Sequence, residues 1–368
     1  MDEKDQYERY ARQVSLPGFG MDGQAKLTNA KVLVIGAGGL GSPVIQYLAA
    51  AGVGTIGIAD GDKIELSNLH RQLLFTTDDI GESKAMMAAD KVRKINPKII
   101  CRAFGYHVTN KNAFDLFSGY EIIVDCTDNF TARYLVSDAC RLLNKPLVFA
   151  AVFQYEGQVA VFNTPDANGE KITYRDLFPE PPSALSAPDC NIAGVLGVLP
   201  GLIGIMQATE VIKLITGIGE TLAGKLLNYD IRTHGSMILE LSASLLAKQL
   251  APVNRKMYEA IDYEWLCGSV DTNAIGKDAL HTMLADPLTI AIDVRESDET
   301  PEAEFMHIKI PLSIFDTFPE MPEFKNIIVF CQSGTRSVKA AGMLRNKFGN
   351  DKQVYHLING IKGYNSQT

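Results

Sequence analysis

The feature of this sequence that most constrains its fold is an apolar run that passes directly into a glycine-rich turn. The segment "AKVLVIGAGGLG" predicts a buried strand that ends in this turn, and "SPVIQYLAAAG" after it has the spacing of an amphipathic helix. Gly36, Gly38 and Gly41 have the GxGxxG spacing. In such a turn, backbone amides and the N-terminus of the next helix can hold phosphate oxygens. The segment therefore predicts a nucleotide-binding unit of a parallel sheet.

Further strand patterns extend this unit. "TIGIAD", "EIIVDCTD" and "PLVFAAV" alternate with helical patterns, which predicts an α/β fold with a doubly wound, Rossmann-like sheet. From Phe153 the pattern changes, because "QYEGQVAVFN" and "GKLLNYDIRTHGSMILEL" alternate as antiparallel strands do. We expect these strands to form an antiparallel extension at one edge of the sheet. Between them, "PEPPSALSAPDC" has no helical or strand period and is interpreted as a mobile surface segment.

A second, small α/β unit follows a polar and irregular stretch. Its central strands are expected in "LTIAIDVRE" and "KNIIVFCQSG". We therefore predict a first domain over residues 1–245, a linker over 246–275 and a second domain over 276–368. With 368 residues, of which 46% are hydrophobic, the chain is long and apolar enough for about two domains.

Charge and composition exclude several classes of partner. A net charge of -8 argues against a nucleic-acid partner, since phosphate binding needs a concentrated basic surface. The start, "MDEKDQYERYARQ", has no apolar core of a signal peptide, so we expect a cytoplasmic protein whose six scattered cysteines are thiols. The apolar run over 192–206 is shorter than the roughly 20 residues needed to span a bilayer. We interpret it as a buried helix pair or a dimer face, and expect no membrane partner.

Side chains after the glycine turn narrow the choice of nucleotide. Asp60 ends the second strand, where a carboxylate can accept the ribose hydroxyls of NAD or of ATP, so the turn alone favours a dehydrogenase. "RYARQ", "DGDKIELSNLHRQ" and "GESKA" add Arg12, Asn68, Arg71 and Lys84. Each of these cations alone is better explained as a solvated surface charge. Together they suit a triphosphate, whose negative charge grows at the leaving pyrophosphate.

A candidate metal ligand lies further along the chain. Asp128 and Asn129 in "DCTDN" follow a predicted strand, and ligands of such sheets bind at the carboxyl ends of strands. A carboxylate in this position is a suitable ligand for the Mg²⁺ that accompanies ATP. We therefore expect ATP and Mg²⁺ as cofactors, with Asp128 as the metal ligand.

The order of these motifs resembles a known family. "RYARQVSLPGFG", "GAGGLGSP", "AGVGTIGIADGDKIELSNLHRQ", "GESKA", "INP", "DCTDN" and "EGQVAVF" look like the MoeB/ThiF/HesA adenylyltransferases, prokaryotic relatives of ubiquitin-activating enzymes, over about residues 5–240. The resemblance implies ATP-dependent adenylation of the C-terminal glycine of a ubiquitin-like sulfur carrier, such as MoaD or ThiS, that ends in Gly-Gly. It also implies a homodimer in which Arg12 reaches the site of the other subunit.

The resemblance also assigns the residues of the nucleotide site. It implies that ATP is held by Gly39, Asp60, Asn68, Arg71 and Lys84, and Mg²⁺ by Asp128. The candidate site further includes neighbours of these residues in the same motifs: Gly36, Gly38, Gly41, Ser67, Leu69, His70 and Asn129.

The sequence departs from this family at the positions of a structural zinc. Many members hold zinc with two CxxC pairs, but the matching stretches here are "TYRD" and "EWLC". Thr173, Asp176 and Glu264 stand where cysteines would, and one thiolate with two carboxylates is a poor tetrahedral zinc site. We therefore expect no structural zinc, and interpret Cys267 as a packed thiol rather than a ligand.

Cys190 has two open interpretations. In "PDCNIAGVLG" it precedes a helical stretch whose terminal amides favour a thiolate. The alternative is a small buried hydrophobic residue, the commoner state of cysteine. By resemblance, the position matches a cysteine that in several relatives forms a transient acyl disulfide or thioester with the carrier. We therefore keep Cys190 as a candidate catalytic residue beside the packing alternative.

The second domain carries its own candidate site. "AIDVRE" and "FCQSGTRSVKAAGMLRNKFG" resemble a rhodanese over about residues 276–368. A six-residue loop from Cys331 to Arg336, followed by a helix, points successive amides at the sulfur. The helix N-terminus and Arg336 would then stabilise an anionic, solvent-reachable persulfide on Cys331. A phosphatase-like loop shares the Cys-to-Arg design but needs one more residue to enclose phosphate, and it is the alternative.

Joined on one chain, the two domains predict a reaction sequence. The first would activate the carrier's terminal carboxylate as an acyl-adenylate, and a persulfide on Cys331 would then give a thiocarboxylate. A sulfur donor such as a cysteine desulfurase would load Cys331. The sequence leaves two other functions open: an NAD-dependent oxidoreductase, and a non-catalytic scaffold that docks a carrier.

Overall fold

An eight-stranded sheet forms the centre of residues 1–267, the first of two units into which the chain divides. The strand order is β3-β2-β1-β4-β5-β6-β7-β8, with β1 to β5 parallel and β6 to β8 antiparallel. The strands are β1 (Lys31–Ile35), β2 (Thr55–Ala59), β3 (Ile100–Phe104), β4 (Ile122–Asp125), β5 (Leu147–Phe153), β6 (Glu156–Phe162), β7 (Lys225–Asp230) and β8 (Gly235–Glu240). This topology confirms the doubly wound sheet with an antiparallel extension.

The structure is a computed structural model. It describes residues 3–181, 194–266, 273–297, 299–332, 334–349, 351–358 and 360–366. Cys190, Cys267 and most of the segment "PEPPSALSAPDC" lie outside these ranges, so what the sequence indicates about them stays a prediction.

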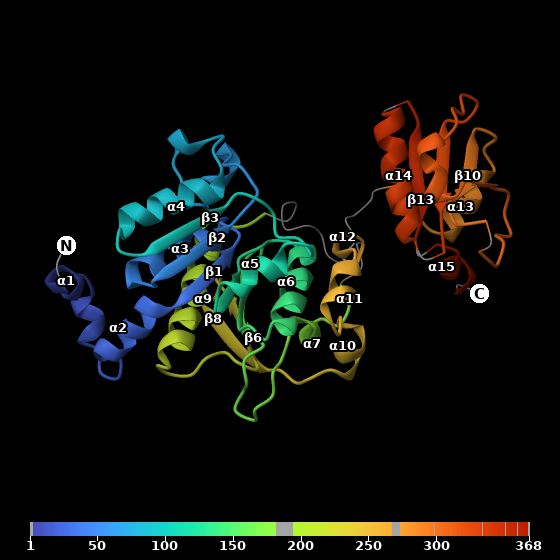
Figure 1. The fold of residues 1–368 in the computed structure, drawn as a ribbon. Coiled ribbons are helices and arrows are strands. Elements are labelled where there is room, and N and C mark those ends of the chain that lie inside the picture. Colours follow the sequence, from blue (N-terminus) through green and yellow to red (C-terminus); the bar gives the residue numbers. More distant parts are fainter. Residues whose placement is uncertain are drawn as a thin grey trace. The chain divides into compact units, whose positions relative to one another are not determined.

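Two apolar faces of the sheet hold the helices of the first unit (Figure 1). In β1, Val32 and Val34 face one hydrophobic cluster and Leu33 and Ile35 face the other, as the period of two in an extended chain requires. The first cluster takes side chains from α2 (Gly20–Asn29), α3 (Gly41–Ala51), α4 (Lys84–Ile95) and α9 (Val198–Thr216). The second takes them from α5 (Ala113–Ser118), α6 (Phe130–Leu142), α7 (Tyr174–Leu177), α11 (Arg255–Ala260) and α12 (Tyr263–Leu266). The other helical segments within the described ranges are α1 (Glu3–Val14), α10 (Leu245–Leu250), η1 (Leu66–Asn68) and η2 (Thr77–Asp79).

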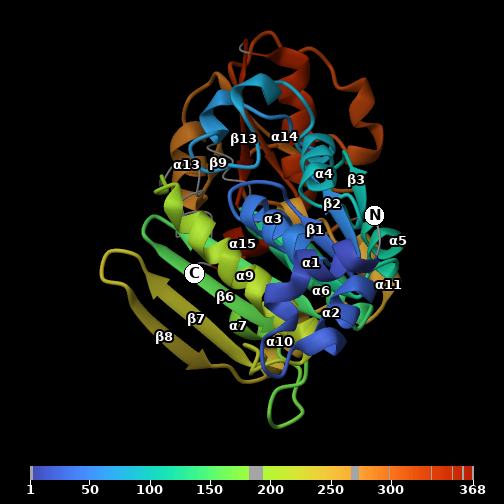
Figure 2. The ribbon, with the colours of Figure 1, turned by 90° about the vertical axis from the view of Figure 1, so that its left-hand side faces the viewer.

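In the apolar run over 192–206, the described residues 198–206 form the first part of α9, and the expectation of a helix pair or a dimer face stays a prediction. The length and composition of α9 alone would let it cross a membrane. Figure 2 shows, however, that α9 lies along β6, and buried Gln207 donates to the carbonyl oxygens of Asp125 at 2.7 Å and Val148 at 3.1 Å. Glu210 accepts from the N–H of Leu222 at 2.8 Å. These contacts identify α9 as a core helix of the sheet.

In the stretch expected as a linker over 246–275, most of the described residues 246–266 are helical. α10, α11 and α12 pack on α6 and α7, and Tyr258 and Tyr263 are buried in the second cluster. The first unit therefore extends to residue 267, well beyond the expected end at 245. Helices of four to six residues are too short to leave a clear periodic pattern in the sequence.

A buried ion pair fastens these short helices to α6. Arg175 donates from Nε to Asp138 Oδ1 at 2.7 Å and from Nη2 to Oδ2 at 2.8 Å. The hydroxyl of Tyr263, in α12, donates to the same Oδ2 at 2.8 Å. The side chains of Arg175 and Asp138 are only 3% and 1% exposed, so the carboxylate and the guanidinium depend on each other for solvation.

Replacing Asp138 by alanine is expected to destabilise the first unit by about 3–5 kcal/mol, because it leaves Arg175 as an uncompensated buried charge. Tyr263→Phe removes one hydrogen bond to that carboxylate and should cost about 1–3 kcal/mol. The free energy of unfolding from urea titration measures both effects. Asp90→Ala, which removes an exposed ion pair with Arg93, is the control and should change it by less than about 1 kcal/mol. A loss in Asp138→Ala no larger than in this control would contradict the role of the pair.

The second unit, residues 268–368, has a five-stranded parallel sheet of order β11-β10-β12-β13-β9. Its strands are β9 (Ala274–Ile275), β10 (Thr289–Asp293), β11 (Ile308–Lys309), β12 (Asn326–Phe330) and β13 (Gln353–Leu357). Its helices are α13 (Lys277–Leu284), η3 (Leu312–Thr317), α14 (Thr335–Phe348) and α15 (Gly360–Ser366). The predicted small α/β domain is confirmed. β12 lies at the centre of the sheet, so Cys331, directly after it, stands at the carboxyl end of the central strand.

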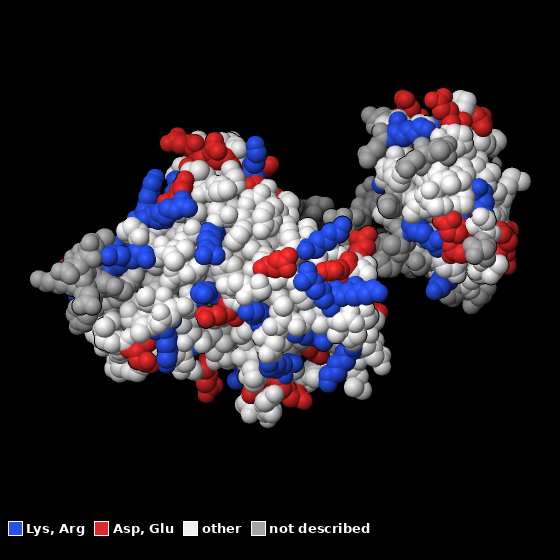
Figure 3. Space-filling view, viewed as in Figure 1, with Lys and Arg blue, Asp and Glu red and all other residues white. Residues whose placement is uncertain are grey.

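Charged side chains of both signs are interspersed on the face of the first unit seen in Figure 3, rather than gathered into one basic area. The expectations of no nucleic-acid partner, no membrane partner and a cytoplasmic location stay predictions.

Candidate functional site

The glycine turn after β1 holds the strand and α3 in close contact. Gly36 has a φ of 91°, in the left-handed region that favours glycine. A Cβ on Gly41 would lie 2.0 Å from the carbonyl oxygen of Gly36, so no larger residue fits at the start of α3. The spacing of the glycines is therefore required by backbone packing as well as by ligand access.

A cavity of about 870 Å³ opens at the carboxyl ends of β1, β2 and β4. The order of strands reverses between β1 and β4, which is the place where doubly wound sheets bind ligands. The predicted residues that line the cavity are Gly36, Gly38, Gly39, Asp60, Ser67, Asn68, His70, Arg71, Lys84, Asp128 and Asn129. Residues from separate motifs thus meet in one site.

Asp60 is anchored against the glycine turn by two backbone groups. The N–H of Ala37 donates to Oδ2 at 2.7 Å, and the N–H of Asp62 donates to Oδ1 at 2.8 Å. Burial raises the pKa of Asp60, and the two hydrogen bonds oppose this shift. Each carboxylate oxygen can accept a further hydrogen bond, so the group can still bind ribose hydroxyls.

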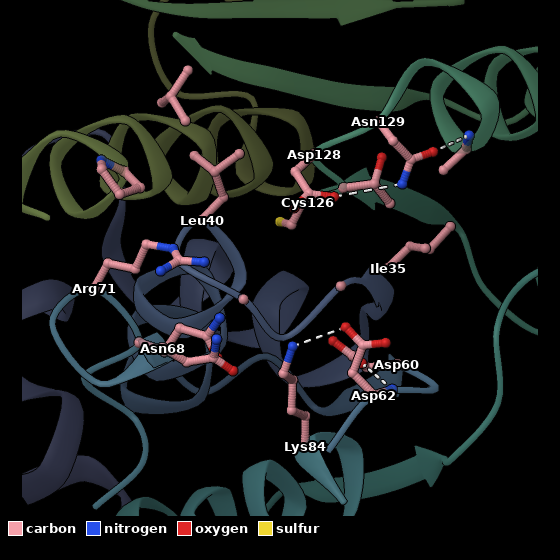
Figure 4. Close-up of a pocket in the computed structure, with 18 of the residues that line it drawn as sticks. Ile35, Leu40, Asp60, Asp62, Asn68, Arg71, Lys84, Cys126, Asp128 and Asn129 are labelled. Carbon is pink, nitrogen blue, oxygen red and sulfur yellow. Dashed lines mark hydrogen bonds and ion pairs between the residues drawn. The ribbon is translucent and has the colours of Figure 1, made fainter. Parts of the chain in front are cut away.

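Lys84 begins α4, and its side chain is only 9% exposed. Its Nζ lies 2.9 Å from Asp62 Oδ2 (Figure 4), and His107 Nε2 lies 3.6 Å from Asp62 Oδ1. Asp62 and His107 were not predicted as cavity residues. Asp62 could have been predicted, because it stands two positions after Asp60 in "DGD". Nothing in the sequence around His107 indicates that it lines the cavity. Asp62 therefore positions the ammonium group of Lys84 in the cavity wall.

Arg71 and Asn68 come from the turn around η1. Arg71 Nη1 donates to the carbonyl oxygen of Ser67 at 3.1 Å, and Asn68 Oδ1 accepts from the N–H of Glu65 at 3.3 Å. Figure 4 shows the guanidinium of Arg71 apart from the pair formed by Lys84 and Asp62. Its other N–H groups have no hydrogen-bond partner within the described ranges, and a guanidinium can bind phosphate through two N–H groups at once.

Asp128 and Asn129 stand at the end of β4 and the start of α6. Asn129 caps α6, since its Oδ1 accepts from the N–H of Ala132 at 2.9 Å, and its Nδ2 lies 3.5 Å from Asp128 Oδ1. Asp128 is exposed and lines the cavity. Mg²⁺ in nucleotide sites commonly takes one or two carboxylates and completes its ligands with phosphate oxygens and water. An exposed carboxylate with one long hydrogen bond fits that requirement.

Three predicted residues do not line the cavity. Gly41 packs against Gly36, and Leu69 is partly buried against the first hydrophobic cluster. Both therefore support the site through packing rather than by forming its wall. Arg12, on α1, is exposed. Arg12 is predicted to act at the site of a second subunit, and this role stays a prediction.

Several apolar residues that line the cavity are absent from the predicted site. They are Leu40, Val108, Val152, Phe153, Val195 and Pro200. Ligand pockets combine such apolar walls with a few polar groups, and a nucleotide base needs an apolar surface to pack on. Apart from Pro200, which lies in the first turn of α9, these residues come from strand ends and loops, where no periodic pattern marks them.

In the second unit, backbone and helix groups surround the sulfur of Cys331. Its Sγ accepts from the N–H of Gly334 at 3.2 Å and lies 3.7 Å from Ser337 Oγ. Gly334 has a φ of 98°, which lets the chain fold back over the sulfur. α14 begins at the next residue, so the N-terminus of a helix with 14 residues faces the sulfur, where it can stabilise an anionic group such as a persulfide.

Two details of this loop differ from the expectation. The side chain of Cys331 is 0% exposed, so its sulfur is buried and the expectation of a solvent-reachable sulfur is wrong for the unmodified cysteine. Arg336 lies in the first turn of α14 and forms two hydrogen bonds with Glu299, one of them from Nη2 to Oε2 at 2.7 Å. Its positive charge is therefore shared with a carboxylate and is not directed at the sulfur alone.

Two residues at the expected zinc positions, Thr173 and Asp176, have another structural role. The N–H and the hydroxyl of Thr173 both donate to Asp176 Oδ2, at 2.8 and 2.7 Å, and cap α7. The N–H of Ser244 donates to Asp176 Oδ1 at 2.8 Å. These contacts join α7 to the start of α10 without a metal. The expectation of no structural zinc stays a prediction, since Cys267 lies outside the described ranges.

The fold and the two sites define a two-domain enzyme that joins a nucleotide-binding unit to a cysteine-based sulfur-transfer unit. A family model described as "ThiF family" matches residues 10–245, and one described as "Rhodanese-like domain" matches residues 277–367. The chain belongs to the ThiF family and carries a rhodanese-like domain after it.

Known relatives span almost the whole chain. A probable adenylyltransferase/sulfurtransferase MoeZ of Mycobacterium tuberculosis is 40% identical over 380 residues, which cover 99% of this chain and 94% of that protein. A sulfur carrier protein adenylyltransferase of Thermus thermophilus is 46% identical over 272 residues, which cover 72% of this chain and 98% of that protein. The crystal structure of E. coli MccB with MccA shares the fold, with a TM-score of 0.54 and 22% identity over 64% of this chain and 72% of that chain.

These similarities decide the class of enzyme. The chain is an adenylyltransferase and sulfurtransferase, and use of ATP follows from the transfer of an adenylyl group. The alternatives of an NAD-dependent oxidoreductase and of a non-catalytic scaffold are therefore set aside.

Proposed function

We propose that the first unit adenylates the C-terminal glycine of a ubiquitin-like sulfur carrier ending in Gly-Gly, with ATP and Mg²⁺. The second unit then supplies a persulfide sulfur to the activated carboxylate, and the product is a thiocarboxylate. One observation carries this proposal, namely that two sites occur in the same chain. The first is a cavity with Arg71, Lys84 and Asp128 at a phosphate-binding turn. The second is Cys331, whose sulfur accepts a hydrogen bond from a backbone amide at a helix N-terminus.

In the adenylation step, the carrier's carboxylate attacks the α-phosphorus of ATP and pyrophosphate leaves. Arg71 and Lys84 provide positive charge where the leaving pyrophosphate gains negative charge. Lys84 would exchange the carboxylate of Asp62 for phosphate oxygens, while Asp60 holds the ribose. Mg²⁺ bound at Asp128 would supply further charge compensation.

In the sulfur step, the persulfide anion on Cys331 attacks the carbonyl carbon of the acyl-adenylate and AMP leaves. This joins the carrier to Cys331 through an acyl disulfide. A thiol then attacks Cys331's sulfur, which releases the thiocarboxylate and leaves a disulfide on the enzyme. Cys190 is the residue that the sequence analysis indicates as the candidate for this thiol.

A reconstitution with purified components tests the proposal. The chain, a carrier ending in Gly-Gly, ATP, Mg²⁺ and a persulfidated desulfurase should show carrier-dependent ATP/pyrophosphate exchange. Mass spectrometry should then show the carrier with one oxygen replaced by sulfur. A carrier lacking its last glycine is the matched control and should support neither reaction. Exchange that does not depend on the carrier, or no exchange at all, would overturn the proposed substrate.

The proposed homodimer predicts a rescue experiment, since Arg12 would act at the site of the other subunit. Mixing Arg12→Ala and Asp128→Ala chains should restore roughly a quarter of the wild-type exchange rate, because half of the dimers are then mixed and each has one intact site. Mixing Lys84→Ala with Asp128→Ala is the control, and should restore nothing because both residues belong to the same subunit's cavity. If tagged mixed dimers form without any rescue, the shared site is contradicted.

A further inference from the structure

Three cations around the Cys331 loop have carboxylate partners, whereas exposed Lys362, whose N–H donates to the carbonyl oxygen of Gln332 at 3.1 Å, has none within the described ranges. Three ion pairs gather there: Arg336 with Glu299, Arg295 with Asp293 at 2.6 Å, and Lys309 with Glu302 at 3.7 Å. Arg295 also binds the Cys331 loop directly, since its Nη1 donates to Gln332 Oε1 at 3.1 Å. A site for small anions would instead present cations without such partners.

The pair of Glu299 and Arg336 is the one coupled to the reactive sulfur. Hydrogen bonding to Glu299 raises the pKa of Arg336, and the charge of Cys331 adds to this effect. The N–H of Glu296 donates to Glu299 Oε1 at 2.9 Å and fixes the carboxylate from the other side. Because Arg336 donates hydrogen bonds to it, the pKa of Glu299 falls to about 2. The carboxylate is therefore ionised throughout the neutral pH range.

Among the described residues, cations and carboxylates around the loop are equal in number. Glu296 accepts from Ser313 Oγ at 2.9 Å and has no cation partner among the described residues. Arg295, Lys309, Arg336 and Lys362 equal in number the four carboxylates Asp293, Glu296, Glu299 and Glu302, and the first three of these cations are each paired with a carboxylate.

We propose that Glu299, by binding Arg336, restricts the sulfur donor of Cys331 to persulfides and disfavours oxyanionic donors such as thiosulfate. This inference rests on the proposed sulfur-transfer function of the second unit. Glu299 acts through Arg336 and is a specificity-determining residue that does not itself touch the transferred sulfur.

The chemistry of the two donors explains the selectivity. The thiolate of Cys331 attacks the outer sulfur of a persulfide R–S–SH, the S–S bond breaks, and the outer sulfur with its proton stays on Cys331 while R–S⁻ leaves. The same attack on thiosulfate expels sulfite, a dianion, from a site that already holds a thiolate. The departure of sulfite needs a cation whose charge is not already compensated. Arg336 could provide this charge, but it is hydrogen-bonded to the carboxylate of Glu299.

Loading of Cys331 by three donors, thiosulfate, cysteine persulfide and a persulfidated desulfurase, tests the inference on the full chain. Glu299→Gln should raise kcat/KM for thiosulfate on the order of 10- to 100-fold, because it frees the charge of Arg336. Loading by cysteine persulfide should change by less than about threefold. Comparison of cysteine persulfide with the desulfurase shows whether the selected donor is a small molecule or a protein.

Matched variants separate this charge effect from a structural one. The gain with thiosulfate should vanish in Glu299→Gln/Arg336→Gln, and Glu299→Asp, which keeps the charge, should show none. Glu323→Gln makes the same change just before β12, at the opposite end of the strand from Cys331, and should behave as wild type. A gain that persists without Arg336, or no gain in a folded Glu299→Gln chain, would overturn the inference.

Salt dependence of the unaltered chain provides a measurement that needs no variant. Raising the ionic strength to about 0.5 M should increase kcat/KM for thiosulfate, because salt screens the repulsion between this dianion and the attacking thiolate of Cys331. A decrease would reveal a cationic site and contradict the inference. If none of the donors loads Cys331, the proposed function of the second unit fails and the inference with it. Loading by persulfide without the Glu299 effect defeats the inference alone.

Discussion

Cys331→Ala is expected to abolish sulfur delivery to the carrier while carrier-dependent ATP/pyrophosphate exchange continues at the wild-type rate. The substitution removes the atom on which the persulfide forms, and loss of a covalent nucleophile commonly costs on the order of 10³-fold or more. Exchange depends on the cavity around Lys84 and Asp128, in the other unit of the chain. Mass spectrometry of the carrier measures the thiocarboxylate, and labelled pyrophosphate measures exchange in the same preparation.

Cys101→Ala is the matched control for this experiment. Burial raises the pKa of the Cys101 thiol to about 11, so it is mainly protonated at neutral pH and should not take up sulfur. Cys190→Ala should lower the yield of thiocarboxylate only if an acyl disulfide is on the path. Undiminished thiocarboxylate formation by Cys331→Ala, with purified components and no free sulfide, would show that the second unit is not the sulfur source.

The parts of the site that follow from local backbone geometry could be predicted from the sequence. Gly36 and Gly41 are constrained by a positive φ and by a close approach of backbone atoms, so their spacing indicates the turn. Asp60 and Asp128 closely follow strands, and the carboxyl ends of neighbouring parallel strands meet at one edge of a sheet. The strand pattern alone therefore predicts that these two carboxylates lie at the same edge, where the cavity opens.

Ion pairs between distant segments could not be predicted in this way. Asp138 with Arg175, and Glu299 with Arg336, are each separated by 37 positions, and no periodic pattern links such partners. Tertiary packing alone brings them together. The same limit explains why Arg336 was expected to serve the sulfur, when its guanidinium is in fact bound to Glu299. It also explains why Asp62, the partner of Lys84, was not predicted as a residue of the site.

Asp128→Ala is expected to abolish carrier-dependent ATP/pyrophosphate exchange, because it removes the carboxylate that would hold Mg²⁺ beside the triphosphate. We expect a loss on the order of 10²-fold or more, and Asp128→Asn should behave similarly because an amide lacks the negative charge that the cation requires. Exchange rates measured over a range of Mg²⁺ concentrations test this. A residual activity in Asp128→Asn that rises with added Mg²⁺ would identify the defect as weakened metal binding.

The surroundings of Asp128 separate this functional loss from a loss of fold. Its carboxylate is exposed and its one hydrogen bond within the described ranges is that of 3.5 Å from Asn129, so its removal should change the free energy of unfolding by no more than about 0.5 kcal/mol. Asp115→Ala removes an equally exposed carboxylate from α5, outside the cavity, and should leave both exchange and stability near wild type. Because Asp128 makes so few contacts within the protein, a stable chain without exchange would show that the carboxylate serves the nucleotide. Wild-type exchange in Asp128→Ala would instead mean that phosphate charge is balanced by Arg71 and Lys84 alone, and that no protein carboxylate is needed for the metal.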